Sequence, residues 1–517
     1  MCGIVGYIGN DQAVPVLLQG LEKLEYRGYD SAGVAVFSED GLKVVKSKGR
    51  LRVLSDLLDG GKALTGTLGI GHTRWATNGE PSDVNAHPHT SMDGKVAIIH
   101  NGIIENASQL RLDLQAEGYR FASATDTEVA AKLLGKIVDK IIADEGKPDL
   151  FKAVRRMARM LEGAFTILAT DCRQTDIAVG ARHDSPLVVG LGEGENFLGS
   201  DVAAFVAYTK RAMEVDQDQA VCVSADKVIV TDFDGNVVEN PKTYTVDWDA
   251  SAAEKGGWDS FMDKEIHEDP AAVQRTLLGR FDANGGITLD EVRIDEHDFK
   301  AIDKIIVIAC GTAAYAGMVA KYAGQVAKYA IEHWVRIPVE IELAHEFRYR
   351  DPILTPRTLV VAISQSGETM DTLMALRHAR EQGSKVLAIC NTQGASIPRE
   401  SDAVLYTHAG PEVAVASTKA FVAQITAAYL LGLYLAQVKG AMFRDEIHQV
   451  LDSLKDMPRK IQWVLDTQPK TIQAAAERMV NANSFLFLGR HVGYPVALEG
   501  ALKLKEIAYT FTEGFAA

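Results

Sequence analysis

Apolar and polar positions divide the chain into two parts with different rhythms. In residues 1 to about 240, short apolar segments alternate with Gly, Asn and Asp, the pattern of strands joined by turns. Strands are expected at Ile4–Ile8, Gly33–Phe37, Val96–Ile99, Phe165–Ala169, Ile177–Val179 and Val228–Thr231. Helices are expected at Val14–Leu24, Asp126–Ile142 and Leu150–Leu161. This mixture predicts an α+β layered sandwich for residues 1–240.

The second part repeats strand, turn and long helix. Its strands are continuous apolar runs, at Lys304–Ala309, Arg357–Ile363 and Lys385–Cys390. Such runs are typical of parallel strands that are buried on both faces, so we expect α/β domains with parallel sheets. The polar stretch 241–258, with Pro241 and two glycines near its end, predicts a linker. The first α/β domain is then expected at residues 259–440.

A weak internal repeat predicts the start of a further α/β domain at residues 441–517. The segment KIIVIACGTAAYAGMVAKYAG resembles SFLFLGRHVGYPVALEGALKLKE, which begins at Ser484. Only one strand and one helix of this second copy are expected before Ala517. Because one strand and one helix cannot bury a parallel sheet, we expect the second domain to be incomplete and the chain to be truncated at its C-terminus.

Composition and charge narrow the class of protein. Hydrophobic residues make up 47% of the 517 positions and charged residues 24%, as in globular domains. The net charge of −15 argues against a nucleic-acid or anionic-membrane partner. Five scattered cysteines without a C-x-x-C pair argue against a disulfide framework or zinc ribbon. The first ten residues, MCGIVGYIGN, do not have the pattern of a signal peptide. The uncharged stretch Ala420–Val438 is interpreted as a buried helix, and the expected location is the cytoplasm.

Cys2 is the first candidate nucleophile. If Met1 is removed, the thiol of Cys2 shares its residue with an α-amine of pKa about 7.7–8.0, which can accept the thiol proton. Taken alone, Cys2 is better explained as a small strand residue. Five other segments change that balance, because they hold more functional side chains than turns require: LEYRGYDSAG (24–33), GHTRWATNGEPS (71–82), NAHPH (85–89), HNGIIEN (100–106) and TDTEV (125–129).

These segments resemble the glutaminase domain of the N-terminal-nucleophile amidotransferases, whose fold is a layered α+β sandwich. The resemblance implies that Cys2 attacks the side-chain amide of glutamine. It assigns the oxyanion hole to the Asn101 side chain and the Gly102 backbone N–H. It also assigns glutamine binding to Arg74, Thr77 and Asp126, and an ammonia gate to Trp75.

Physical chemistry agrees with these roles. Loss of one oxyanion donor costs roughly 3 kcal/mol, and a free amino acid needs a cation for its carboxylate and an anion for its ammonium group. Read singly, Arg74 could form a surface ion pair and Asp126 could cap a helix. Asn78 stands where family members usually have His, so we expect altered glutamine affinity rather than an inactive site.

A second set of motifs suggests a sugar-phosphate pocket. Ser364 to Thr369 (SQSGET) follows an apolar strand and precedes a helix, where hydroxyls and backbone N–H groups bind phosphate or simply cap the helix. CGTA (310–313) and VASTKAF (415–421) stand at comparable positions. The second part of the chain resembles sugar-isomerase (SIS) domains, and this resemblance assigns phosphate contacts to Ser364, Gln365, Ser366 and Thr369, with Thr312 and Ser417 nearby.

Two further features bear on this pocket. Ala313 replaces a serine that many family members have, which removes one hydrogen bond of about 0.5–1.5 kcal/mol. Glu499, Lys503 and Glu506 lie on one helix face by their spacing, as in an ordinary ion pair. By resemblance Lys503 lies in the site, and Glu506 moves the proton between the first two sugar carbons.

Together the resemblances imply transfer of the amide nitrogen of L-glutamine to fructose 6-phosphate, with isomerisation to glucosamine 6-phosphate. They imply no metal or organic cofactor and a homodimer formed through the SIS domains. A histidine and a lysine of the family lie beyond the position of Ala517, so the chain is expected to retain glutaminase chemistry more readily than synthase chemistry. Loops of asparagine-synthesising and phosphoribosyl amidotransferases are absent from the sequence. The alternative is a sugar-phosphate-binding regulatory protein with residual glutaminase activity.

Overall fold

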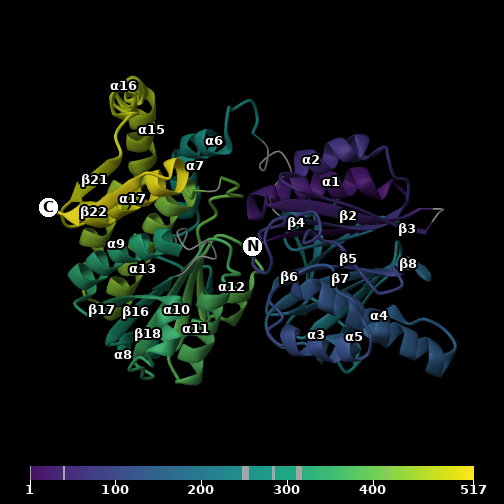
Figure 1. The fold of residues 1–517 in the computed structure, drawn as a ribbon. Helices are drawn as coiled ribbons and strands as arrows, with labels where there is room; N and C mark the ends of the chain where they lie inside the picture. Colours follow the sequence, from purple (N-terminus) through teal and green to yellow (C-terminus); the bar gives the residue numbers. More distant parts are fainter. Residues whose placement is uncertain (1, 39–40, 247–254, 282–285, 310–316, 415) are drawn as a thin grey trace. The chain divides into compact units, whose positions relative to one another are not determined.

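The computed structural model describes residues 2–38, 41–246, 255–281, 286–309, 317–414 and 416–517 (Figure 1). The chain divides into two units, Met1–Ala253 and Glu254–Ala517, each with its own sheets and core.

The first unit contains two antiparallel sheets. The eight-stranded sheet has the order β14 (Thr243–Thr245), β11 (Arg211–Glu214), β9 (Val188–Leu191), β10 (Asn196–Gly199), β1 (Gly3–Ile8), β4 (Leu68–Arg74), β2 (Ser31–Ser38) and β3 (Gly41–Lys48). The six-stranded sheet has the order β13 (Val228–Asp232), β12 (Gln219–Val223), β8 (Gln174–His183), β7 (Phe165–Asp171), β6 (Val96–Gly102) and β5 (His89–Thr90).

Alternation along the strands explains the layers of this unit. On β4, Ile70 packs into the core between the two sheets, together with Ile99 of β6 and Leu168 of β7. The outer face of the first sheet packs against α1 (Ala13–Leu24) and α2 (Leu51–Leu57). The outer face of the second packs against α3 (Ala107–Ala116), α4 (Asp126–Glu145) and α5 (Leu150–Ala158) (Figure 1). The result is a four-layer α/β/β/α sandwich, as the sequence predicts.

The expected linker begins too early. Residues 243–245 form β14, which pairs with β11 in the register Ala212↔Tyr244, and Val246 is buried in the same core. The composition of this stretch is polar, but a neighbouring strand with unpaired backbone groups supplies the hydrogen bonds that make it a strand. The first domain therefore includes part of the segment 241–258.

The second unit is built on a six-stranded sheet. Its order is β15 (Glu291–Val292), β20 (Ala403–Tyr406), β19 (Lys385–Cys390), β18 (Thr358–Ser364), β16 (Lys304–Ala309) and β17 (Val339–Leu343). The last five of these strands are parallel, and β15 is antiparallel to β20. The three predicted strands are thus adjacent in the centre of a parallel sheet.

Helices cover both faces of this sheet, which is why its strands are apolar throughout. Along β16, Ile305 and Val307 face one core and Ile306 and Ile308 face the other. The first core is shared with α7 (Asp269–Leu277), α8 (Glu296–Ala301), α9 (Gly317–Val335), α13 (Lys419–Lys439) and α14 (Arg444–Lys455). The second is shared with α10 (Ala344–Tyr349), α11 (Met370–Glu381) and α12 (Ser396–Glu400). A short helix, α6 (Phe261–His267), precedes α7.

Helix α13 contains the uncharged stretch Ala420–Val438, which is long enough to raise the question of membrane insertion. Among the described residues it is the one helix long and apolar enough to cross a membrane by these two criteria alone. Three of its leucines, Leu430, Leu431 and Leu433, are fully buried in the core of the second unit. This burial agrees with its interpretation as a core helix.

The C-terminal segment differs from its prediction in two ways. Ile447, Leu451 and Leu454 of α14 pack into the first core of the parallel sheet, so this core extends beyond residue 440. After α15 (Met457–Thr467) and α16 (Pro469–Met479), the expected strand β21 (Ser484–Gly489) and helix α17 (Gly493–Ala508) are followed by an unpredicted strand, β22 (Phe511–Ala516). Strand β22 is parallel to β21 and completes a β–α–β unit.

Candidate functional site

Cys2 stands directly before β1, beside the end of β4. Its Sγ accepts a hydrogen bond from the backbone N–H of Trp75 at 3.2 Å. Burial is the largest influence on the thiol and raises the pKa of Cys2, while the nearby Arg74 lowers it. A thiol in this environment is protonated near neutral pH and needs a base before it can act as a nucleophile.

The proposed oxyanion donors lie next to Cys2, at the end of β6 in the opposite sheet. Asn101 Nδ2 donates to the carbonyl oxygen of Cys2 at 2.9 Å. Gly102 has φ +124°, and a Cβ at this position would lie 2.0 Å from the carbonyl oxygen of Ala164. Only glycine therefore fits at the position directly after Asn101.

Arg74, the last residue of β4, is buried, which does not fit the alternative of a surface ion pair. Its side chain is 3% exposed, and the guanidinium donates to the carbonyl oxygens of Asn78 and Gly79, the latter at 3.1 Å. Its Nη1 has no hydrogen-bond partner among the described residues. Burial lowers the pKa of the guanidinium, whereas Cys2 and Asp126 lie close enough to raise it. A buried cation with an unpaired donor is suited to bind a carboxylate.

Asp126 is the first residue of α4, and its alternative interpretation as the helix cap is wrong. The cap is Thr125, whose Oγ1 accepts from the backbone N–H of Glu128 at 3.2 Å. Asp126 Oδ2 instead accepts from the backbone N–H of Ile104 at 2.9 Å, which ties α4 to the segment after β6. The carboxylate is thereby held near Arg74 and retains acceptor capacity.

Two residues predicted for this site, Thr77 and Trp75, lie at exposed positions. Thr77 is exposed in the loop after β4, and Asn78 contributes its backbone carbonyl to Arg74. The side chain of Trp75 is 39% exposed and lies edge-on to Tyr29, with ring centroids 5.4 Å apart. A gating role for Trp75 stays a prediction.

Sequence reasoning missed a group of buried histidines beside this site: His72, His87, His89 and His100. His72 contacts Asn101, and His100 Nδ1 lies 3.0 Å from Thr127 Oγ1 in the first turn of α4. One signal was available in GHTRWAT. Because side chains alternate along a strand, His72 and Arg74 share a face of β4, and a face that carries a functional arginine can carry a second polar contributor.

The proposed phosphate loop connects β18 to α11. Gly367 adopts φ +69° and its backbone N–H donates to Ser364 Oγ at 3.0 Å. Ser364 Oγ also lies 3.4 Å from Thr369 Oγ1, and Ser366 Oγ accepts from the backbone N–H of Glu368 at 3.2 Å. Serine and threonine hydroxyls therefore gather at the N-terminus of α11, where the helix dipole favours an anion. Gln365 is half-buried in the same loop.

The other expected parts of this pocket are described only in part. Thr312 and Ala313 lie outside the described residues. Ser417 Oγ donates to Glu412 at 2.9 Å, and Glu412 also accepts from the backbone N–H of Thr418 at 2.9 Å, at the start of α13. Ser417 is therefore held by a carboxylate at a helix N-terminus.

The predicted charged face of α17 is present. Lys503 Nζ lies 3.3 Å from Glu499 Oε1 and 2.7 Å from Glu506 Oε2. Burial raises the pKa of Glu499 to about 7, Lys503 lowers it, and the neighbouring Glu506 and Glu412 raise it further. An intrahelical ion pair accounts for these contacts, and the proton-transfer role of Glu506 stays a prediction.

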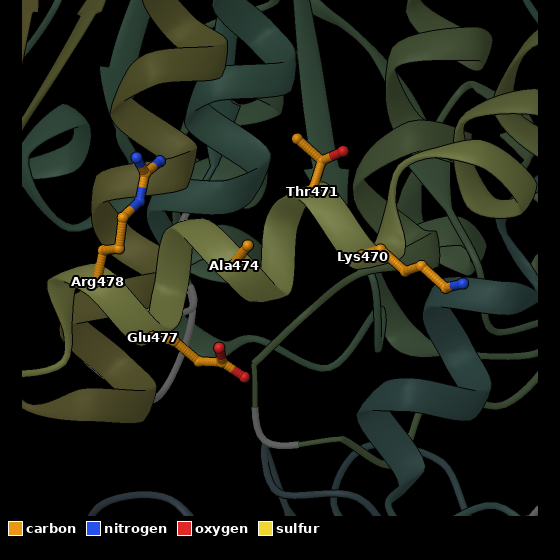
Figure 2. A pocket seen from close by; sticks show the side chains of 5 residues that line it. All are labelled: Lys470, Thr471, Ala474, Glu477 and Arg478. Carbon is orange, nitrogen blue, oxygen red and sulfur yellow. The ribbon is translucent and has the colours of Figure 1, made fainter.

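A pocket on α16 is lined by Lys470, Thr471, Ala474, Glu477 and Arg478 (Figure 2), all from one helix. Figure 2 shows Lys470 and Arg478 near opposite ends of this helix, so they do not converge on one point. Among the described residues, no group of three or more His, Cys, Asp or Glu side chains is arranged to hold a metal ion.

Comparison with known proteins gives matches in both units. Residues 72–207 match the glutamine amidotransferase domain model and residues 299–434 the SIS domain model. The chain is 60% identical to "Glutamine--fructose-6-phosphate aminotransferase [isomerizing]" of Corynebacterium efficiens and 57% identical to the protein of that name from Streptomyces coelicolor. Both alignments cover 100% of this chain and 82% of the relative.

One solved structure is also similar. The C-terminal domain of glucosamine-fructose-6-phosphate aminotransferase from Francisella tularensis is 38% identical, with a TM-score of 0.47, and the match covers 51% of this chain and 71% of that one.

Proposed function

The chain belongs to the glutamine–fructose-6-phosphate aminotransferase (isomerizing) family, and from this premise we propose which of its residues perform the reaction. The enzyme transfers the amide nitrogen of L-glutamine to fructose 6-phosphate and isomerises the product to glucosamine 6-phosphate, releasing glutamate. Its two units correspond to the two halves of this reaction, glutamine hydrolysis in the first and sugar amination in the second.

In the first unit, Cys2 is the nucleophile. After removal of Met1, the α-amine of Cys2 takes the thiol proton, and the thiolate attacks the amide carbon of glutamine. Asn101 Nδ2 and the Gly102 N–H stabilise the negative oxygen that forms. The amide nitrogen takes the proton and leaves as ammonia, and water then hydrolyses the thioester to glutamate. Burial raises the pKa of the thiol, which supports a mechanism that supplies its own base.

The observation that carries this proposal is the unpaired donor of Arg74. A buried guanidinium is costly unless its donors are bonded, and Nη1 has no partner among the described residues while Cys2 and Asp126 lie near it. A glutamine carboxylate on Arg74 and its ammonium group on Asp126 satisfy both charges. Thr77 borders the same loop and completes the set we assign to glutamine binding.

In the second unit, the phosphate of fructose 6-phosphate binds at the N-terminus of α11. Ser364, Gln365, Ser366 and Thr369 form this cradle, and the hydroxyls near the helix N-terminus support the assignment. The resemblance to SIS domains adds Ser417 and Thr312, of which Thr312 lies outside the described residues. Glu506 transfers the proton between the first two sugar carbons, and Lys503 lies beside it. Ammonia must stay unprotonated between the two reactions, so we assign Trp75 to gating its release.

The remaining proposals concern partners and location. We infer a homodimer formed through the SIS domains and a cytoplasmic location, with no nucleic-acid or membrane partner. The net charge of −15 supports the absence of a polyanionic partner.

A coupled assay tests the residue roles. The chain is incubated with glutamine, with and without fructose 6-phosphate, and glutamate and glucosamine 6-phosphate are quantified together for the wild type and Cys2→Ala. We expect glutamate from the wild type and none above background from Cys2→Ala, because the amide then lacks its nucleophile. Equal glutamate release by both would exclude Cys2 as the nucleophile.

The same assay tests the second unit. Ser366→Ala is expected to raise the fructose 6-phosphate concentration needed for half-maximal aminosugar formation, and to leave basal glutamate release unchanged. An unchanged fructose 6-phosphate requirement in Ser366→Ala would contradict the assignment of Ser366 to the phosphate cradle.

A further inference from the structure

We propose that His72 is a positioning residue for the oxyanion donor: it holds the Asn101 amide in the orientation that points Nδ2 toward Cys2. The inference rests on the proposed roles of Cys2 and Asn101 and adds a residue to which neither the sequence nor the comparisons give a role.

The geometry joins the two sheets of the sandwich. His72 lies on β4 and Asn101 on β6, and His72 is fully buried. His72 Nε2 lies 3.0 Å from Asn101 Oδ1 and 3.0 Å from the carbonyl oxygen of His100. The other end of the same amide, Nδ2, donates to the carbonyl oxygen of Cys2 at 2.9 Å. The contacts therefore run from the imidazole through the amide to the residue of the nucleophile.

The carbonyl of His100 decides the direction of these bonds. A carbonyl oxygen can only accept, so Nε2 must carry the hydrogen, and the imidazole donates from this nitrogen. The atom of Asn101 that faces Nε2 must then be an acceptor, which is Oδ1. A flipped amide would turn its NH₂ group toward the imidazole N–H and its oxygen toward the Cys2 carbonyl, so two bonds would be lost together.

The surroundings keep His72 neutral, so the single N–H of its ring is the one on Nε2. Burial lowers the pKa of His72 to about 3; nearby His100 and Arg74 also lower it, and the bonds to Asn101 and to the His100 carbonyl raise it. The ring of His87 lies 4.3 Å from that of His72, centroid to centroid, and burial lowers the pKa of His87 as well. Nδ1 of His72 has no partner among the described residues. Among the described residues, the hydrogen bonds of the ring therefore all run through Nε2.

Two substitutions separate this role from simple packing. The side-chain nitrogen of glutamine stands at the same number of bonds from Cγ as Nε2 of histidine, so His72→Gln keeps a donor toward Asn101. His72→Asn places its nitrogen one bond nearer and loses the donor. We expect His72→Asn to lower kcat for glutamine hydrolysis at least about tenfold with little change in KM, and by no more than the factor of about 10²–10³ that follows loss of an entire oxyanion donor. His72→Gln is expected to recover most of kcat.

A second readout reports on the folded site without using the oxyanion hole. Alkylation of Cys2 by iodoacetamide forms no oxyanion, so its rate, followed on the Cys2 peptide by mass spectrometry, is expected to be the same in both variants and in the wild type. In the Asn101→Ala background, His72→Asn is expected to cause no further loss of kcat, because the group that it positions is absent.

The outcomes distinguish this inference from the proposed function. Absence of glutamine hydrolysis in the wild type would overturn the proposed function itself. An active wild type with full kcat in His72→Asn would overturn only the positioning role. Loss of both kcat and Cys2 alkylation, or further loss in the Asn101→Ala background, would mean that His72 acts by general packing, and would also overturn the inference.

Discussion

At the scale of single residues, the first unit keeps one buried donor unpaired where a substrate charge is expected. Arg74 donates to two backbone carbonyls through Nη2, which fixes the guanidinium plane, and its Nη1 has no partner among the described residues. A guanidinium held in this plane donates from Nη1 in a fixed direction, whereas a lysine ammonium can only act as a point charge.

Arg74→Lys therefore tests whether geometry or charge binds glutamine. We expect KM for glutamine to rise about 10-fold or more, because one charge-assisted hydrogen bond is worth about 1.5–3 kcal/mol, with a smaller change in kcat. Steady-state glutaminase kinetics measure both constants, and the rate of Cys2 alkylation serves as the control for folding. An unchanged KM would show that the carboxylate binds elsewhere.

At the scale of elements, the loop between β18 and α11 depends on a glycine. Gly367 has φ +69°, and a Cβ there would lie 2.5 Å from Ala395 Cβ and 2.8 Å from Cys390 Sγ. Any side chain must push the loop away from the α12 segment, which also moves the N–H that Ser364 accepts.

Gly367→Ala is therefore expected to lower the affinity for fructose 6-phosphate at least about tenfold, as measured by calorimetry, because a displaced loop loses more than one hydrogen bond to phosphate. Gly383→Ala is the matched control. Gly383 follows α11 with φ +86°, but the nearest atom to its Cβ, Pro356 Cγ, is 3.9 Å away. Gly383→Ala also places a side chain at a positive φ, but without a clash. Equal losses of affinity for fructose 6-phosphate in both variants would contradict the assignment of the β18–α11 loop to phosphate binding.

At the scale of the whole molecule, the two units hold buried groups with opposite pH responses. In the first unit, burial lowers the pKa of His72 to about 3 from 6.5, and also lowers that of His87. Below about pH 6.5 the unfolded chain binds protons that the folded unit does not. The stability of the first unit therefore falls as the pH is lowered, by about 1.4 kcal/mol per pH unit for each such histidine. In the second unit, burial raises the pKa of Glu265 to about 7 from 4.5. Its folded form binds a proton that the unfolded chain releases between these values, so stability falls as pH rises.

Lowering the pH from 7 to 5.5 is therefore expected to destabilise the first unit and to stabilise the second relative to it. Hydrogen exchange of the full chain, corrected for the intrinsic pH dependence, measures this on peptides from β6 and β7 and from β16 and β18. Protection from exchange should fall in the β6 and β7 peptides, and it should stay the same or rise in the β16 and β18 peptides. A parallel change in both pairs would contradict the assignment of these groups as neutral in the folded chain.

Much of the fold follows from local patterns. Alternating strands of the first unit, the continuous apolar strands of the second and the long helices were all predictable, because burial of apolar side chains sets the period of each element. The proposed nucleophile and the residues proposed to act with it were equally accessible: Cys2, Asn101, Gly102 and Asp126 stand in short motifs whose residue types carry the proposed chemistry. These features need no knowledge of distant partners.

Tertiary structure decided what depends on such partners. Tyr244 lies in a polar stretch, yet the edge strand β11 makes this stretch a strand, and β22 forms because β21 lies beside it. Asp126 is not the helix cap, because Thr125 takes that place. His72 gained its significance only when β4 and β6 packed face to face, since no local pattern shows that an imidazole will meet the amide of Asn101. Sequence specifies the chemistry that each residue can perform, and only packing determines which residues perform it together.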